Sequence, residues 1–269
     1  MKRVLVYFLT ACLISWLCWM PYFVPGFPVA WQTSSFLHYL GLTGPLLSAL
    51  IGTWQQDAQP GLRKLFRSML LPRGAFFYAV IVPLLPFLLL FLAASFATLG
   101  YFSSLDWRGL WRTRELGPVH PLAFIALNVG VVGLGEETGW RGYALPRLQQ
   151  HFSAFSSSLI LTVGWAIWHW PLFFYVNSGY HSMEIAGIVG WLMSLLTGSI
   201  LFTWLFNSSR GSILSCALFH GFMDIAFMAD LGKPEIANYV GMSVTIWGLS
   251  ILFLYKFRHL SPWPRLRVV

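Results

Sequence analysis

Two carboxylates and an arginine interrupt an apolar run in the middle of the sequence, at Glu136, Glu137 and Arg141. Two similar interruptions follow, Trp-Ala-Ile-Trp-His at 165–169 and His-Gly-Phe-Met-Asp at 220–224. Ionisable side chains inside apolar segments are rare and usually functional. Carboxylates and imidazoles act as general acids and bases and bind metal ions. We therefore expect the three segments to meet at one chemical site.

Helical spacing predicts how the first and third segments are used. Glu137 and Arg141 are four residues apart, with the acid before the base, so we expect an ion pair that neutralises charge within the membrane. Glu136 points about 100° away around the helix, has no predicted partner in its own helix, and is left for chemistry. His220 and Asp224 share one helix face and can act together on a metal ion or a water molecule.

The elements that must position these residues are transmembrane helices. The chain of 269 residues is 57% hydrophobic and 10% charged, with a mean hydropathy of +0.66, which excludes an ordinary soluble domain. We predict a single all-α domain over 1–269, a polytopic transmembrane bundle of about eight helices. Spans of about 20 residues are expected near 4–23, 37–54, 76–100, 121–145, 157–176, 184–206, 212–229 and 236–256.

The net charge of +8 comes from basic residues gathered at the predicted membrane edges, which is the positive-inside pattern and does not indicate nucleic-acid binding. An even number of spans puts both termini on one side, which we predict to be the cytoplasm, across a prokaryotic plasma membrane. The basic edges are Lys2, Arg3, Arg63, Lys64, Arg67, Arg73, Lys256, Arg258, Arg265 and Arg267.

Two further features concern the surfaces of the bilayer. The segment 101–120 should face outward although it contains Arg108, Arg112 and Arg114, so we predict an interfacial helix or loop on the outer surface. The fourteen tryptophans are predicted to form aromatic belts at the two interfaces.

The predicted spans place the chemistry-bearing residues at similar depths. With a rise of about 1.5 Å per residue and a core about 30 Å thick, Glu136 lies about 8 Å from the cytoplasmic boundary. On the same scale His169 is about 18 Å deep, His220 about 12 Å and Asp224 about 18 Å. A shared layer on three helices favours a water-filled site that opens to the cytoplasm. Trp165, one turn before His169, is expected to form a wall of it.

These motifs resemble those of the CPBP intramembrane proteases, also called the Abi or type II CAAX prenyl endopeptidase family. The family pattern is E-E-x-x-x-R, then F-x-x-x-H, then H-x-x-x-N or D, and the sequence matches it over a catalytic core at about 120–230, with Trp165 where Phe is usual and Asp224 as the Asp form. The resemblance implies an intramembrane endopeptidase. It implies that Glu136, His169 and His220 are catalytic and that Glu137, Arg141 and Asp224 support them.

Two versions of peptide hydrolysis fit the resemblance. In one, His169 and His220 with Asp224 or Glu136 bind Zn²⁺, which activates water and polarises the carbonyl. In the other, Glu136 and His169 activate water without a metal and His220 faces the oxyanion. The carboxylate at position 224 favours zinc, because an ionised Asp cannot donate a hydrogen bond to an oxyanion.

Two other classes of function remain open from the residues. Buried Glu, His and Asp also form proton relays in transporters, although the polar residues are concentrated in the later spans and no paired halves are visible. A membrane scaffold without chemistry is the second alternative. For the protease, the expected partners are the lipid bilayer and a membrane-associated peptide, either a prenylated CAAX-type tail or a bacteriocin-like precursor.

Overall fold

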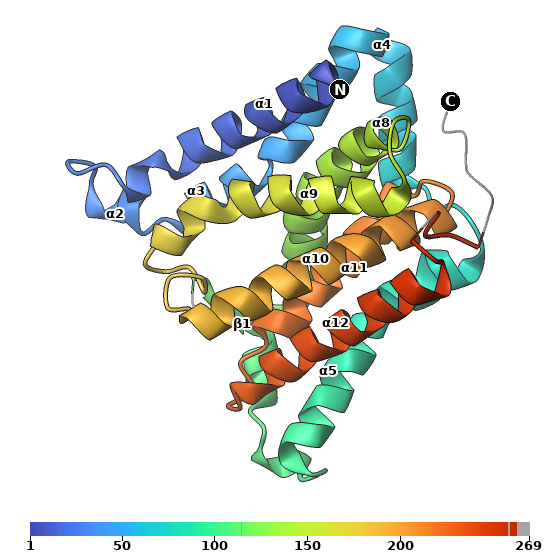
Figure 1. Cartoon of the computed structure of the whole chain (residues 1–269). Helices are drawn as coiled ribbons and strands as arrows, with labels where there is room; N and C mark the ends of the chain where they lie inside the picture. The colour runs from blue at the N-terminus through green and yellow to red at the C-terminus, as the bar shows by residue number, and fades with distance from the viewer. Residues whose placement is uncertain (114, 258, 263–269) are drawn as a thin grey trace.

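The computed structural model describes residues 1–113, 115–257 and 259–262, which form an all-α bundle (Figure 1). Seven of its helical segments are long and apolar enough to cross a membrane, and Ile213–Met228 is a shorter apolar helix. The predicted polytopic fold of about eight spans is confirmed, and the chain is a multi-pass integral membrane protein. Arg114, Arg258, Arg265 and Arg267 lie outside the described residues.

The helices and turns follow one another with short connections. In chain order they are α1 (Lys2–Trp19), the 3₁₀ turn η1 (Met20–Tyr22), α2 (Val29–Gln32), α3 (Ser35–Leu42), α4 (Gly44–Leu70), the π turn η2 (Phe77–Ile81), α5 (Val82–Thr98), the 3₁₀ turns η3 (Phe102–Ser104) and η4 (Trp107–Trp111), strands β1 (Arg112–Thr113) and β2 (Gly117–Pro118), α6 (Pro121–Leu127), the π segment η5 (Asn128–Gly133), α7 (Leu134–Glu137), the π segment η6 (Thr138–Ala144), α8 (Leu145–Leu148), α9 (Ala154–His169), the 3₁₀ turn η7 (Trp170–Phe174), α10 (Ile185–Ser208), α11 (Ile213–Met228) and α12 (Glu235–Leu254).

The second span differs most from its prediction. A basic loop was expected after residue 54, whereas α4 continues to Leu70 through a sharp kink at Ala58, which has a left-handed φ of 46°. Figure 1 shows α4 rising to an apex and turning back down as a second helical arm. That arm buries Leu65, Ser68 and Met69 against the bundle and turns its charged residues outward. The hydropathy of the region is low because its apolar face is only one side of a helix.

The fourth span, Pro121–Leu148, is a helix with two widened π segments, η5 and η6, on either side of the single turn α7. A π turn adds a residue to the helical repeat, and such turns occur mostly at functional sites. α7 carries the sequence Leu-Gly-Glu-Glu, so both carboxylates of the first motif lie between the two widened segments.

Glycine allows the fourth span to pack backbone to backbone against α11. A Cβ added to Gly133 would lie 2.2 Å from the carbonyl oxygen of Ala217, and one added to Gly221 would lie 2.7 Å from the carbonyl of Asn128. Close helix approach through small residues is typical of membrane proteins. It brings the turn that carries Glu136 next to the helix that carries His220.

The segment over 101–120 contains two 3₁₀ turns and a short β-hairpin whose strands have two residues each. In the hairpin Arg112 pairs with Pro118 and Thr113 with Gly117. It is tied to the end of α11 by two backbone hydrogen bonds, one from the amide of Asp106 to the carbonyl of Leu231 and one from the amide of Asp230 to the carbonyl of Gly109. Its placement on the outer membrane surface stays a prediction.

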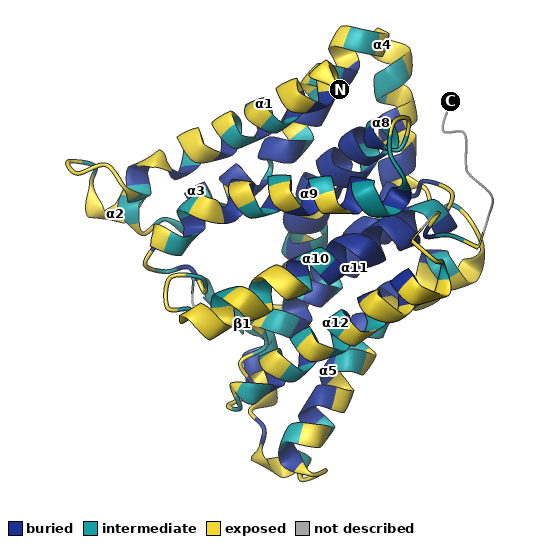
Figure 2. Cartoon of the chain, in the orientation of Figure 1, coloured by how far each residue is buried: buried dark blue, intermediate teal, exposed yellow. Residues whose placement is uncertain are grey.

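Burial divides the helices into a polar-lined interior and an apolar exterior. Figure 2 shows α11 and the second half of α10 mostly buried, while α1, α5 and α12 each present an exposed side. The most buried tryptophans include Trp140, Trp165 and Trp168, with exposed fractions of 1%, 6% and 0%. Trp140 and Trp168 are therefore interior side chains and not part of an interfacial belt, contrary to the prediction, whereas the burial of Trp165 agrees with its predicted place in the wall of the site.

Candidate active site

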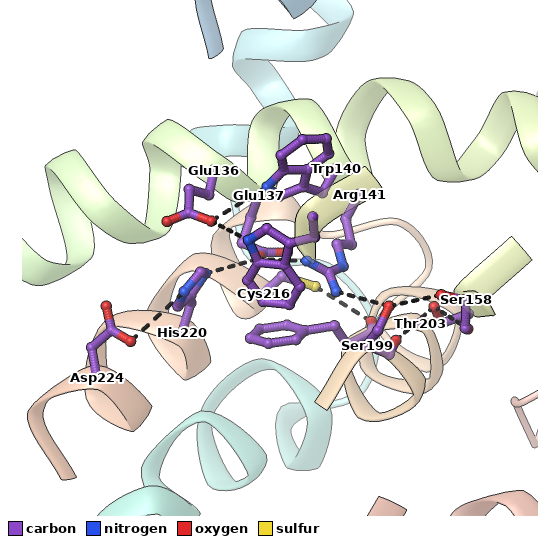
Figure 3. Close-up of polar contacts among 12 residues, drawn as sticks. Glu136, Glu137, Trp140, Arg141, Ser158, Ser199, Thr203, Cys216, His220 and Asp224 are labelled. Carbon is purple, nitrogen blue, oxygen red and sulfur yellow. Dashed lines mark hydrogen bonds and ion pairs between the residues drawn. The ribbon is translucent and has the colours of Figure 1, made fainter. Parts of the chain in front are cut away.

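The carboxylate of Glu136 is buried, with 2% of the residue exposed, and is held by two indoles. The Nε1–H group of Trp165 donates to Glu136 Oε2 at 2.6 Å, and that of Trp140 donates to the same oxygen at 3.3 Å. Figure 3 shows the other carboxylate oxygen of Glu136 pointing away from Trp140. The prediction that Glu136 has no partner within its own helix is wrong, because Trp140 lies one turn further along it.

Glu137 joins the first motif to the third. Its Oε1 accepts a hydrogen bond from Arg141 Nη1 at 2.9 Å and lies 2.8 Å from His220 Nδ1. Glu137 and Arg141 have no exposed side-chain surface, and the side chain of His220 is 8% exposed. The predicted pair of Glu137 and Arg141 is present. Its contact with His220, which the sequence did not predict, also fixes the histidine ring.

The guanidinium of Arg141 lies between two aromatic rings, 4.8 Å from the ring centre of Trp165 and 4.3 Å from that of Phe202. Its Nη2 also lies 3.5 Å from Ser199 Oγ. A buried guanidinium is stabilised by a carboxylate partner and by aromatic faces. Arg141 therefore balances the charge of Glu137 and supports the ring that donates to Glu136.

His220 also faces the last residue of the third motif. His220 Nε2 lies 3.8 Å from Asp224 Oδ1, which is beyond hydrogen-bond distance but close enough for charge interaction. The predicted common face of these two residues is present. The Asp224 side chain is 29% exposed and lies one turn before α11 ends at Met228. The sequence predicted that the site opens toward the cytoplasmic, basic ends of the helices. Asp224, the most exposed of the six predicted site residues, instead lies toward the opposite ends of the helices.

His169 is the last residue of α9, and Pro171 lies in the 3₁₀ turn that follows it. Its Nδ1 lies 2.8 Å from the carbonyl oxygen of Trp165. A carbonyl only accepts hydrogen bonds, so Nδ1 carries the proton and the neutral ring presents Nε2 as an acceptor. The rings of Trp168, Tyr180 and Trp191 surround it, with centre separations of 4.7, 5.6 and 5.8 Å.

Trp165 connects all three segments. Its ring centre lies 5.8 Å from that of His169 and 5.5 Å from that of His220, and its indole nitrogen contacts Glu136. The three motifs therefore share one site, as predicted. Sequence reasoning treated Trp165 as a change of pocket shape only. The signal that it missed is the N–H group that tryptophan adds where the family pattern has phenylalanine.

Tyr180, outside the spans, is a second residue that sequence reasoning missed. Its ring packs against His169 and Trp191, with centre separations of 5.6 and 5.7 Å. Removal of water from the hydroxyl raises the pKa of Tyr180 well above the usual value for tyrosine, and the nearby carboxylates of Asp224 and Glu136 raise it further. The hydroxyl therefore stays protonated and can donate a hydrogen bond.

A metal ion needs several ligands close together, and Zn²⁺ is bound in proteins by at least three. Among the residues that the structure describes, no three His, Cys, Asp or Glu side chains are grouped closely enough to hold a metal ion. The predicted set of His169, His220 and Asp224 therefore does not fit a metal ion as these residues are placed.

Comparison with known proteins places the site within a family. Residues 118–226 match the family model for type II CAAX prenyl endopeptidase Rce1-like proteins. The chain is 31% identical over 137 residues to CAAX prenyl protease 2 from Methanococcus maripaludis, an alignment that covers 50% of this chain and 46% of the relative. The chain therefore spans about half the length of the curated relative that it matches. The segment matched by the family model contains all six predicted site residues, so both comparisons support the resemblance to the CPBP, or type II CAAX prenyl endopeptidase, family over the part of the chain that carries the site.

Proposed function

We propose that the chain is an intramembrane endopeptidase that hydrolyses a peptide bond of a membrane-associated substrate. The observation that carries the proposal is the environment of Glu136, a buried carboxylate with one oxygen held by two indole donors. Hydrogen bonds stabilise the ionised form of a buried carboxylate, which is the form a general base requires. A purely structural carboxylate would be paired with a cation, as Glu137 is with Arg141.

In this proposal Glu136 activates a water molecule. With Oε2 held by Trp165 and Trp140, the second oxygen accepts a proton from water while the water oxygen bonds to the substrate carbonyl carbon. His169 presents Nε2 as an acceptor and orients the same water. The proton held by Glu136 then passes to the amide nitrogen as the carbon–nitrogen bond breaks, which gives a carboxylic acid and a free amine.

The negative charge on the tetrahedral oxygen needs hydrogen-bond donors. His220 donates through Nδ1 to Glu137, and in its protonated form it also has a proton on Nε2 for the oxyanion. Asp224 supports that positive charge from 3.8 Å and need not donate itself, which removes the difficulty raised by an Asp at this position. The protonated hydroxyl of Tyr180 is the second donor.

A farnesylated peptide with a CAAX carboxyl terminus is the first substrate to test, because the curated relative is named for CAAX prenyl proteolysis. The purified protein in lipid nanodiscs is incubated with this peptide, with the same peptide lacking the lipid, and with a bacteriocin-like precursor. Products are identified by mass spectrometry. Glu136→Gln should abolish cleavage while the variant keeps the wild-type melting temperature, and Glu184→Gln, at an exposed carboxylate outside the site, should cleave normally.

Each alternative gives a different result in this experiment. A transporter would carry protons into liposomes in a Glu136-dependent manner without cleaving any peptide, and a scaffold would do neither. Zinc chemistry, proposed from the sequence, predicts about one zinc ion per chain in active protein and its loss in His220→Ala. Metal analysis of the same preparations tests that version.

A further inference from the structure

The second arm of α4 forms a basic hollow at the end of the bundle opposite the 101–120 segment. The hollow has a volume of about 410 Å³ and is lined by Gln59, Pro60, Arg63, Lys64, Arg67 and Arg73. This volume lies in the range of about 300–1,000 Å³ that is usual for small-molecule sites in proteins. It lies outside the matched family region at 118–226 and is independent of the proposed proteolysis.

The kink of α4 creates this hollow. Ala58 adopts a left-handed conformation and Pro60 follows it, so the chain reverses direction just beyond the apolar part of the span. Ser68 then fixes the returning arm, because its hydroxyl donates to the carbonyl of Gly211 at 2.5 Å and accepts from the amide of Ile213 at 3.3 Å. The cationic side of the arm is therefore held in place by buried contacts on its other side.

The charges of the hollow are of one sign. Four of its six lining residues are cationic, and no carboxylate of the described chain lines it. Arg63, Arg67 and Arg73 therefore present positive charge to the same hollow, which favours an anion there. The planar fork of a guanidinium matches the oxygens of a phosphate group and binds them in pairs. Three arginines around one hollow therefore fit an anion with several oxygens, such as a phosphate group, better than a chloride ion.

The surroundings indicate that the phosphate belongs to a lipid. Phe66, Leu70 and Leu71 on and just after the arm are 43%, 65% and 47% exposed, and Phe76, before the third span, is 69% exposed. The basic hollow thus adjoins exposed apolar side chains at the point where a span enters the bilayer. Amphipathic helices with this division of residues lie at the membrane surface, and basic pockets at this level bind anionic headgroups.

We propose that the hollow lined by Arg63, Arg67 and Arg73 binds the phosphate headgroup of an anionic phospholipid, whose acyl chains lie against Phe66, Leu70 and Leu71. The positive-inside rule requires basic residues at this edge but does not require a preformed hollow or a preference among lipids.

The test measures lipid binding to the full chain by native mass spectrometry in detergent. Phosphatidylglycerol and phosphatidylcholine with identical acyl chains are added in turn, and inorganic phosphate is added in a third series. We expect phosphatidylglycerol to bind at least tenfold more tightly than phosphatidylcholine. The double variant Arg63→Gln with Arg67→Gln should remove that preference, whereas Arg108→Gln with Lys233→Gln, cations at the other end of the bundle, should keep it.

Both double variants are first checked for the wild-type melting temperature. If Arg63→Gln with Arg67→Gln is unstable, Arg73→Gln alone serves in its place, because Arg73 follows the helical arm and is not part of it. An equal preference for phosphatidylglycerol in the two double variants would overturn the proposal. Displacement of the lipid by millimolar inorganic phosphate would assign the hollow to soluble phosphate and would overturn the lipid assignment.

Discussion

Replacing Trp165 with Phe removes one hydrogen bond to Glu136, the proposed base, and keeps an aromatic six-membered ring at this position. Trp165 is 6% exposed, and its Nε1–H lies 2.6 Å from Glu136 Oε2. Phe is the usual residue here in the family pattern, so the variant should fold. The change therefore tests whether the indole acts on the carboxylate or only fills space.

The size of the effect follows from the hydrogen bond. A hydrogen bond to a charged group contributes about 1.5–3 kcal/mol, which corresponds to a factor of about 10 to 150 in an equilibrium constant. Trp140 still donates to the same oxygen at 3.3 Å, so we expect the lower end of that range. Loss of the donor disfavours ionised Glu136 relative to its protonated form. The pH profile of kcat/KM should move to higher pH, with a fall of about tenfold on its acidic side that recovers as the pH rises.

The assay is cleavage of the best peptide substrate, measured as kcat/KM at several pH values in nanodiscs. Trp204→Phe is the matched control, because Trp204 is also 6% exposed and its buried Nε1 has no hydrogen-bond partner within the described residues. Trp140→Phe should shift the pH profile in the same direction by a smaller amount. Loss of activity in Trp165→Phe that is independent of pH, and equal to that of Trp204→Phe, would refute the reasoning.

Three further predictions concern the charge pair, the helix packing and the tyrosine. Arg141→Ala leaves Glu137 buried without its cation and should cost about 3–5 kcal/mol of stability, seen as a lower melting temperature that exposed Arg108→Ala does not show. Gly133→Ala should lower both melting temperature and activity because its Cβ meets the Ala217 carbonyl, whereas Gly130→Ala, with no atom within 4 Å, should not. Tyr180→Phe should lower kcat by up to about tenfold at every pH from about 6 to 9, because a tyrosine with a raised pKa is protonated throughout that range. A loss in Tyr180→Phe that appears only at one end of the range would contradict that role.

The spans could be predicted because long apolar runs in a chain with so little charge are typical of transmembrane helices. The second arm of α4 could not be predicted in this way. Its buried residues Leu65, Ser68 and Met69 are interleaved with basic residues, so average hydropathy falls although one helical face is apolar. The signal that identifies this arm is the helical period of its apolar residues over 59–70, which an average conceals.

Within the site, the ion pair of Glu137 and Arg141 was predictable because it depends on spacing along one helix. The contacts of Glu136 were not predicted because tryptophan was counted as an apolar residue. Trp140 follows Glu136 by four residues, which is the same helical spacing that predicted the contact of Arg141 with Glu137. That spacing could therefore also have predicted the hydrogen bond from the Trp140 indole N–H to Glu136. The contact between Glu137 and His220 depends on how two helices pack, which the sequence alone does not fix.

The two widened segments η5 and η6 bear on how the chain tolerates insertions and deletions. In a regular helix each residue turns the chain by about 100°, so loss of one residue before α7 would rotate both carboxylates away from α9 and α11. The helix would persist with ordinary hydrogen bonds and a similar content of apolar residues. A single-codon deletion within 128–133 should therefore give a membrane-inserted but inactive protein, which makes the length of this turn as constrained as the identity of Glu136.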